Sequence, residues 1–207
     1  MKKVTIIDYM MGNLRSVAKA FEFVGSKVCV SNKKEDLRAA DFLVLPGVGA
    51  FEKGIHNLKT LGIIDVLEEE VIEKKKLFLG ICLGMQLLAR ESHEDGIHQG
   101  LNWVKATVEK FDTSRQLRVP HMGWNEVQTT KDNILFSDIG ERPVFYFIHS
   151  YHLVCDDEGI TTATCEYGEK FPAVIQKDNI FATQFHPEKS QKEGLQLLQN
   201  FVNIPES

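Results

Sequence analysis

The chain has 207 residues, 43% of them hydrophobic, and this content is enough for a sizeable core. Its formal net charge of -5 at pH 7 argues against a protein that binds nucleic acid or anionic membranes through a general basic field. The sequence contains no secretion signal, no apolar stretch long enough to span a bilayer and no CxxC pair among its four cysteines, so we expect a cytoplasmic protein with reduced thiols and no metal.

The first half of the chain alternates short apolar runs with patterns of helical period. We expect strands at 4–8, 28–31, 42–45 and 77–81, and helices at 14–23, 34–39 and 65–75. This alternation is typical of a doubly wound α/β fold, in which helices cover both faces of a mostly parallel sheet. Ligands of such sheets gather beyond the carboxyl ends of the strands, so the loops after Asp8, Leu45 and Ile81 should share one edge.

The second half has a different pattern, in which apolar runs follow one another closely. Its strand-like segments are 104–111, 125–129, 144–149, 161–166, 173–176 and 180–185, and they precede an expected helix at 192–202. We interpret them as additional antiparallel strands. No internal repeat, low-complexity tract or linker divides the chain, so we expect residues 1–207 to form a single domain.

A cysteine between two glycines is the strongest chemical signal. Cys82 lies in the pentapeptide GICLG at 80–84, directly after an apolar run. Glycines on both sides suit a sharp strand-to-helix turn that holds a nucleophile. The adjacent helix N-terminus favours the thiolate over the thiol. The alternative is a small buried residue that ends a hydrophobic strand.

A thiolate that transfers acyl groups needs a base and a group that orients the base. His186 follows an apolar strand and has a carboxylate, Glu188, two positions later; in an extended segment both point to the same side. His121, His149 and His152 are competing bases, but none has an acidic residue so placed. The sequence therefore predicts a triad of Cys82, His186 and Glu188.

Acyl transfer also needs two donors for the developing oxyanion. The backbone N–H of Leu83, directly after the nucleophile, is the first candidate. The loop at 46–49, with Val48 and Gly49, offers the second, because its glycines let a backbone amide turn into an adjacent pocket. The alternative for this loop is a plain tight turn after a strand.

These motifs together resemble a known family. GICLGMQ at 80–86, HPE at 186–188 and PGVGAF at 46–51 resemble the class I glutamine amidotransferases. Within that class, VPHMGWNEV at 119–127, FYFIHSYH at 145–152 and FHPEKS at 185–190 are similar to the glutaminase subunits of imidazole glycerol phosphate synthases. The resemblance extends from Asp8 to the last expected helix.

The resemblance implies hydrolysis of glutamine to glutamate and ammonia. Cys82 would form a glutamyl thioester, His186 would protonate the ammonia and activate water, and Glu188 would hold the imidazole. The positions that match glutamine-binding residues of the family are Gly49, Gln86, Ser150 and Tyr151. No cofactor and no metal is implied.

The resemblance also implies a partner. The recognised segments use nearly the whole chain, so we expect a separate subunit to consume the ammonia. In the family this is a (β/α)8 barrel cyclase, which forms a heterodimer with the glutaminase, receives ammonia through a channel and makes imidazole glycerol phosphate and AICAR in histidine biosynthesis. The residues that match the family's docking face are Asn13, Trp124, Asn125, Tyr146 and Lys189. Trp124 and Tyr146 have an alternative interpretation as core aromatics.

One departure from the family concerns Met10, which stands where a glycine is common. A bulky side chain there predicts a changed partner surface. Two other functions remain open from the sequence: a paralogous subunit that supplies ammonia for amidation of surface sugars, and a free-standing γ-glutamyl hydrolase. A regulatory binding module is disfavoured, because the nucleophile, base and carboxylate are all present.

Overall fold

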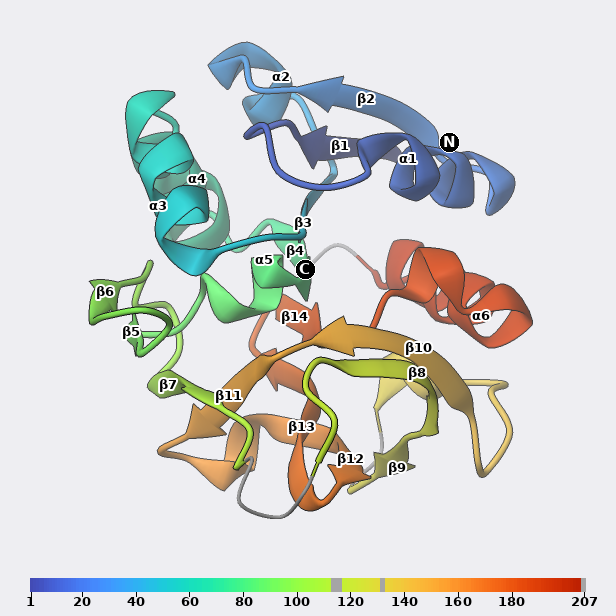
Figure 1. The fold of residues 1–207 in the computed structure, drawn as a ribbon. Helices are drawn as coiled ribbons and strands as arrows, with labels where there is room; N and C mark the ends of the chain where they lie inside the picture. Colours follow the sequence, from blue (N-terminus) through green and yellow to red (C-terminus); the bar gives the residue numbers. More distant parts are fainter. Residues whose placement is uncertain (113–116, 131–132, 206–207) are drawn as a thin grey trace.

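An eight-stranded sheet forms the centre of the protein in the computed structural model, which describes residues 1–112, 117–130 and 133–205 (Figure 1). The strand order is β2-β1-β3-β4-β14-β13-β12-β9. The strands are β1 Lys3–Ile7, β2 Lys27–Ser31, β3 Phe42–Gly47, β4 Leu77–Cys82, β9 Gln128–Thr129, β12 Thr161–Tyr167, β13 Glu169–Lys177 and β14 Ile180–Thr183. From β2 to β14 the neighbours are parallel, and from β14 to β9 they are antiparallel.

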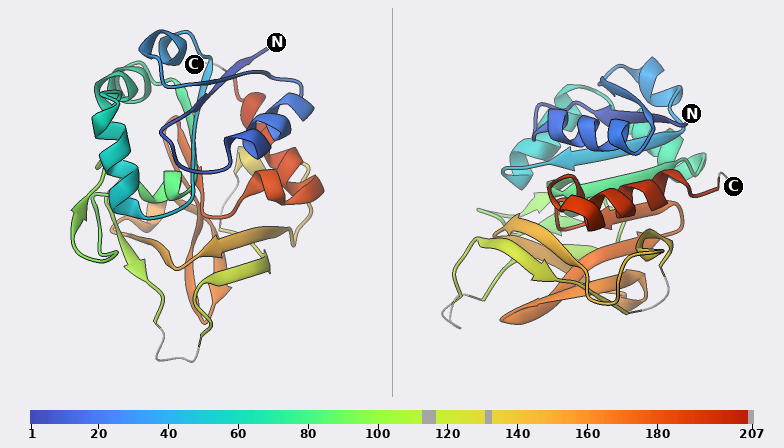
Figure 2. Two further views of the ribbon diagram at one scale, coloured as in Figure 1. Left: turned by 45° about the horizontal axis from the view of Figure 1, so that its top comes forward. Right: turned by 90° about the vertical axis from the view of Figure 1, so that its right-hand side faces the viewer.

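Helices cover both faces of the parallel part. Helices α1 (Leu14–Phe23) and α6 (Gln191–Val202) lie side by side on one face (Figure 2). The other face carries α3 (Phe51–Thr60), α4 (Ile64–Leu67) and the short α2 (Lys34–Arg38). A π-helical segment, Glu68–Glu73, continues α4.

Alternation along the strands divides the core between these faces. On β1, Ile6 packs in the cluster that contains Phe21 and Phe201, whereas Ile7 packs in the cluster that contains Ile55. Successive side chains of a strand point to opposite faces, so an apolar strand such as β3 fills both clusters. The expected doubly wound α/β fold is confirmed.

The second half adds two smaller sheets of short strands. β8 (His121–Glu126) pairs antiparallel with β10 (Val144–His149). A four-stranded sheet has the order β11-β7-β5-β6, with β5 Glu91–Ser92, β6 His98–Gln99, β7 Ala106–Lys110 and β11 Tyr151–Cys155. One-turn 3-10 helices occur at Ile134–Phe136, Glu158–Ile160 and Pro187–Lys189. The expected additional antiparallel strands are confirmed.

Several element boundaries differ from expectation. The strand expected at 125–129 is two strands, because β8 begins four residues earlier and Val127 leaves the ladder to bond with the Pro143 carbonyl oxygen. Helix α3 was not predicted, although Phe51, Ile55 and Leu58 have helical spacing and are all buried. The helix expected at 65–75 changes to π geometry at Glu68.

The parallel strands bring four loops to one edge. Gly47 at the end of β3 lies opposite Cys82 at the end of β4, and Thr183 at the end of β14 lies opposite Ile81. β1 runs parallel to β3, so the loop after β1 reaches the same edge. The shared edge predicted from the sequence is confirmed, and the segment that carries His186 joins it. No helix in the described part of the chain is long and apolar enough to cross a membrane.

Candidate active site

Cys82 occupies a strained turn between β4 and the one-turn helix α5 (Leu83–Gln86). Its φ of 55° and ψ of -108° lie outside the regions that non-glycine residues ordinarily adopt. The neighbouring glycines are needed for close approach: a Cβ on Gly84 would overlap the carbonyl oxygen of Leu45, and one on Gly80 would lie 2.9 Å from the Gly84 carbonyl oxygen. This geometry fits a nucleophile held on an elbow.

His186 and Glu188 form a buried pair. His186 Nδ1 lies 2.9 Å from Glu188 Oε1, and each side chain is 3% exposed. The pair does not arise from an extended segment, because Pro187–Lys189 is a 3-10 turn; the turn brings the two side chains together instead. Since the carboxylate accepts from Nδ1, the proton at Nδ1 is fixed and Nε2 is available for chemistry.

The charge environment of His186 favours its protonated form. Its Nε2 is buried without a hydrogen-bond partner among the described residues. Burial alone lowers the pKa of an imidazole, but interaction with Cys82 and the hydrogen bond to Glu188 outweigh it and raise the pKa of His186 to about 10. The imidazole is thus able to hold a proton at the edge where Cys82 lies.

The three competing histidines lie in a separate cluster. His121 Nδ1 and His149 Nε2 are 3.0 Å apart, and His152 packs with its ring centroid 4.7 Å from that of Phe111. Burial lowers the pKa of His121 to about 4 and that of His149 to about 3. Among the described residues, none of the three pairs with a carboxylate within 3.5 Å, so His186 is the better base.

The second oxyanion candidate lies beside the nucleophile. Val48 and Gly49 directly follow Gly47, the residue opposite Cys82, and Gly49 has a φ of 114° that favours glycine. The loop after β1 packs against them: a Cβ on Gly12 would lie 3.5 Å from the Val48 nitrogen. Leu83, the first candidate, is the residue after Cys82 on the elbow.

Two of the predicted glutamine-binding residues, Gln86 and Tyr151, belong to a chain of polar contacts that ends at Cys82. Gln86 Nε2 donates to the Tyr151 carbonyl oxygen at 2.8 Å and to Gln184 Oε1 at 3.2 Å, and Gln184 Nε2 lies 3.7 Å from Cys82 Sγ. Ser150 links β10 to β11, and its carbonyl oxygen accepts from the Phe111 N–H at 3.3 Å. Gln184, which is fully buried, was not predicted; a polar amide at the end of an apolar strand, two residues before His186, is the sequence signal that could have identified it.

The predicted docking residues fall into two groups. Lys189 Nζ lies 5.6 Å from the centroid of the Tyr146 ring, and Trp124 packs edge-on against that ring at 5.8 Å. Trp124 is 44% exposed, which contradicts its interpretation as a core aromatic. Asn13 is exposed and caps α1 by accepting from the Ser16 N–H at 3.3 Å. Asn125 differs, because its amide turns inward to His121 Nε2 at 3.1 Å.

Met10 has a conformation that explains the family's preference for glycine. Its φ is 63°, in the left-handed region that glycine adopts without steric cost. Its side chain is 60% exposed, so the extra bulk projects into solvent and not into the fold.

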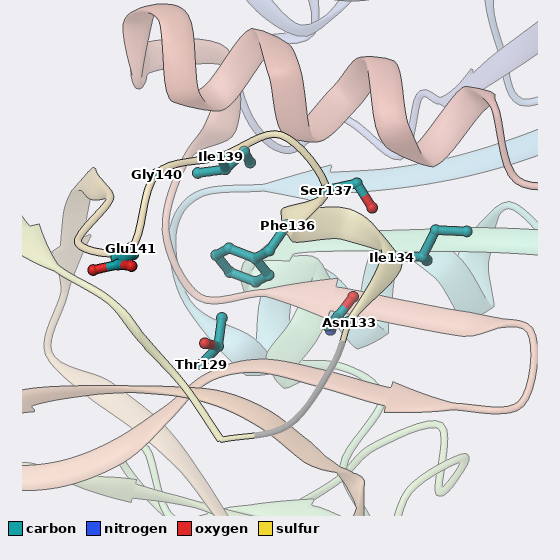
Figure 3. Close-up of a pocket in the computed structure, with 8 residues that line it drawn as sticks. All are labelled: Thr129, Asn133, Ile134, Phe136, Ser137, Ile139, Gly140 and Glu141. Atoms are coloured by element: carbon teal, nitrogen blue, oxygen red, sulfur yellow. The ribbon is translucent and has the colours of Figure 1, made fainter.

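A separate hollow of about 530 Å³ is lined by Thr129 at the end of β9 and by residues 133–141. Figure 3 shows its lining, with Thr129, Asn133 and Glu141 around the ring of Phe136. Its lining residues contain no cysteine, histidine or lysine, and all come from the segment 129–141. It therefore lacks the nucleophile and base found at the sheet edge. Within the described ranges, no group of three or more His, Cys, Asp or Glu side chains is arranged to hold a metal ion.

Comparison with known proteins agrees with the geometry at the sheet edge. The family description "Glutamine amidotransferase class-I" matches residues 5–204. The chain belongs to the class I glutamine amidotransferases. Solved structures share the fold: a glutamine amidotransferase from Thermotoga maritima has a TM-score of 0.63 at 20% identity, with 90% of this chain and 76% of that chain covered. A chain of PurLQS from Thermotoga maritima has a TM-score of 0.72 at 19% identity, with 98% and 99% covered.

Curated relatives identify the family to which the chain belongs within this class. Imidazole glycerol phosphate synthase subunit HisH 1 of Campylobacter jejuni (strain 81-176) is 49% identical over 97% of this chain and 100% of its own length. Subunit HisH of Methanocaldococcus jannaschii is 48% identical, and subunit HisH 2 of Pseudomonas aeruginosa is 43% identical, each over 97% of this chain and 99% of the relative. The chain thus belongs, within its class, to the HisH family of imidazole glycerol phosphate synthase subunits.

Proposed function

We propose that Cys82, His186 and Glu188 hydrolyse glutamine to glutamate and ammonia. The observation that carries this proposal is the 2.9 Å contact between His186 Nδ1 and Glu188 Oε1, at the edge where Cys82 occupies a strained elbow. The contact leaves Nε2 as the proton-transferring atom of the base. A thiolate, a base and an orienting carboxylate are the three parts that acyl transfer needs.

The reaction has two halves. The Cys82 thiolate attacks the side-chain amide carbon of glutamine, and the resulting tetrahedral intermediate collapses with cleavage of the C–N bond. His186 gives its Nε2 proton to the departing ammonia and leaves a glutamyl thioester. His186 then takes a proton from water, whose oxygen attacks the thioester, and glutamate leaves as Cys82 regains its thiolate. Glu188 holds the imidazole throughout and stabilises its charged form.

The oxyanion and substrate sites complete the proposal. We assign the oxyanion donors to the backbone N–H of Leu83 and to the Val48–Gly49 segment, which lies beside Gly47 opposite Cys82. Glutamine would contact Gly49, Gln86, Ser150 and Tyr151. The site is nearly closed, because Cys82 is 5% exposed and His186 is 2% exposed. We propose that substrate entry involves a rearrangement at the sheet edge, and we expect the isolated chain to be nearly idle.

The ammonia would pass to a partner. We propose a heterodimer with a (β/α)8 barrel cyclase that makes imidazole glycerol phosphate and AICAR in histidine biosynthesis. The docking face would contain Asn13, Trp124, Asn125, Tyr146 and Lys189. Exposed apolar side chains support this assignment: Met10, Met122 and Trp124 are 44% to 60% exposed, and they belong to the loop after β1 and to β8, which carry Asn13, Trp124 and Asn125. A single domain over residues 1–207 and a cytoplasmic location fit the continuous sheet and the four free thiols.

The proposal is tested by measuring glutamine hydrolysis by the isolated chain and by the chain with a candidate cyclase, each with and without the cyclase's nucleotide ligand. We expect strong activity only in the ligand-bound complex. High activity of the isolated chain would instead indicate a free-standing hydrolase. Stimulation by an amidating enzyme and not by the cyclase, in the same assay, would indicate the paralogous role in surface sugar chemistry.

A further inference from the structure

A row of buried and partly buried hydrogen bonds connects Asn125, one of the proposed docking residues, with the proposed glutamine site. His149 Nδ1 lies 2.8 Å from the Tyr151 carbonyl oxygen, and a carbonyl oxygen can only accept, so Nδ1 carries the proton. The neutral His149 ring therefore accepts at Nε2, and His121 Nδ1, 3.0 Å away, must donate to it. His121 Nε2 in turn accepts from the Asn125 amide at 3.1 Å. These contacts therefore fix the same tautomer in both rings, with the proton at Nδ1.

The same carbonyl oxygen begins the second half of the row. Tyr151 O also accepts from Gln86 Nε2 at 2.8 Å; Gln86 donates to Gln184 Oε1 at 3.2 Å, and Gln184 Nε2 lies 3.7 Å from Cys82 Sγ. Gln86 is 6% exposed and Gln184 is fully buried. One backbone oxygen thus joins a chain from the docking face to a chain that ends at the nucleophile.

Aromatic packing holds the two rings in place. His121 lies between Tyr167 and Phe147, with ring centroids 4.0 Å and 4.8 Å away and interplanar angles of 19° and 24°. His149 packs against Phe111 and Phe171, each with its centroid 5.2 Å away. Rings packed on both sides and hydrogen-bonded at both nitrogens are constrained, so a displacement at Asn125 would shift the hydrogen-bonded row or break it.

From these contacts we infer that His121 and His149 are positioning residues that couple contacts at Asn125 to the placement of Gln86, Gln184 and Cys82. Neither histidine would touch glutamine or exchange protons with it. The Asn125 amide nitrogen is already engaged by His121 and by Cys165 Sγ at 3.8 Å, which leaves its carbonyl oxygen as the atom a partner's donor would take. This inference rests on the proposed function, since it concerns regulation of the same glutamine site.

The test uses the heterodimer with the cyclase and compares His121→Phe with His152→Phe. His121→Phe keeps an aromatic ring between Tyr167 and Phe147 but removes both hydrogen bonds. His152 is the matched control: it is 5% exposed in the same aromatic cluster, but its Nδ1 bonds to the Leu153 carbonyl oxygen, outside the row. Glutaminase kcat and KM are measured with and without the cyclase's ligand, together with ammonia-dependent synthesis and the melting temperature.

We expect His121→Phe to lower the ligand-induced stimulation of glutaminase kcat by about tenfold, with ammonia-dependent synthesis unchanged. His152→Phe should keep the stimulation within about twofold of the native value. If both variants lose stimulation, each in proportion to its decrease in melting temperature, the histidines only stabilise the fold and the inference is overturned. Full stimulation in His121→Phe would overturn it as well.

A second pair of variants separates positioning from packing if His121→Phe does not fold. His149→Asn keeps an N–H near the position of Nδ1 and so the bond to Tyr151 O, but it loses the bond to His121. His149→Phe loses both. We expect His149→Asn to retain basal activity and to lose the stimulation by the cyclase's ligand. We expect His149→Phe to lose the stimulation and also to raise KM for glutamine. Retained stimulation in His149→Asn would contradict the coupling through the two histidines. If the native heterodimer itself fails to hydrolyse glutamine, that result contradicts the proposed function, and the inferred coupling is contradicted with it.

Discussion

The backbone N–H of His186 donates to the carbonyl oxygen of Tyr146 at 2.9 Å. The proposed base is therefore fixed to a strand of the proposed docking face. Ser190 strengthens the connection: its buried hydroxyl donates to the His186 carbonyl oxygen at 2.6 Å and accepts from the Tyr146 N–H at 3.0 Å. β10 and the segment that carries the base would move together when a partner binds.

Removal of the Ser190 hydroxyl should lower glutaminase kcat by more than its effect on stability explains. Ser190→Ala loses two buried hydrogen bonds, and we expect a loss of about 1–3 kcal/mol in the free energy of unfolding. Misplacement of the base should lower glutaminase kcat in the complex by about tenfold or more. Ser92→Ala is the control, because Ser92 is equally buried but its hydroxyl accepts from the nearby Glu94 N–H, away from the triad. Similar kcat values for the two variants at matched stability would contradict the role of Ser190.

Substitution of the orienting carboxylate should remove most of the activity. Glu188→Gln loses the negative charge and can leave His186 in the wrong tautomer, so we expect kcat for glutamine hydrolysis to fall by roughly 10²–10⁴-fold. Without the carboxylate the pKa of His186 should fall, because the hydrogen bond to Glu188 is one of the interactions that raise it. NMR titration of His186 and steady-state kinetics measure the two effects. An unchanged kcat would remove Glu188 from the triad.

The two buried neutral histidines should make the protein sensitive to acid. The pKa values of His121 and His149 are lowered by burial to about 4 and about 3, below the ordinary value of 6.5. Between pH 6.5 and 4 the unfolded chain takes up protons that the folded chain excludes, so stability falls with falling pH by up to about 1.4 kcal/mol per pH unit for each ring. The raised pKa of His186 acts above pH 6.5 and does not affect this window.

Urea unfolding across this pH range measures the slope. His121→Phe and His149→Phe should each make it shallower, and a His56→Gln control at an exposed histidine should leave it unchanged. An unaltered slope in both buried variants would show that these rings are not the acid-sensitive groups.

The Tyr9 hydroxyl should clash with a side chain introduced at Gly47. The hydroxyl is buried without a hydrogen-bond partner among the described residues, and a Cβ on Gly47 would overlap it. Tyr9→Phe removes an unsatisfied polar group, and we expect it to leave stability unchanged or raise it by about 1 kcal/mol. Gly47→Ala should cost about 1–3 kcal/mol.

The double variant tests the contact directly. Tyr9→Phe should recover part of the cost of Gly47→Ala, although the alanine Cβ would still lie 3.0 Å from the Leu83 Cβ. Strict additivity of the two changes in a denaturant cycle would argue against contact between them.

The sequence predicts the parts of this site that depend on local pattern. The elbow at Cys82 and the pair His186 and Glu188 are short motifs, and the parallel strands that gather them follow from apolar runs separated by helices. The reason for the pairing was wrong in detail, because a 3-10 turn and not an extended segment brings Glu188 to His186.

What the sequence does not predict depends on distant pairing. Gln86 and Gln184 are 98 positions apart, and the His121 and His149 contact depends on the register of β8 with β10. The strand expected at 125–129 would have placed His121 outside the sheet. The hydrophobic periodicity of a sequence does not determine the boundaries of an irregular strand to within a few residues. Those boundaries and the register nevertheless decide which side chains are in contact.

The most direct test of the central claim compares native chain and Cys82→Ala in heterodimers with the cyclase, each supplied with glutamine or with ammonia. We predict that Cys82→Ala abolishes glutamine-dependent synthesis of imidazole glycerol phosphate and leaves ammonia-dependent synthesis at the native rate. Glutamine-dependent synthesis that persists in Cys82→Ala, or the loss of both activities in a folded and assembled complex, would contradict it.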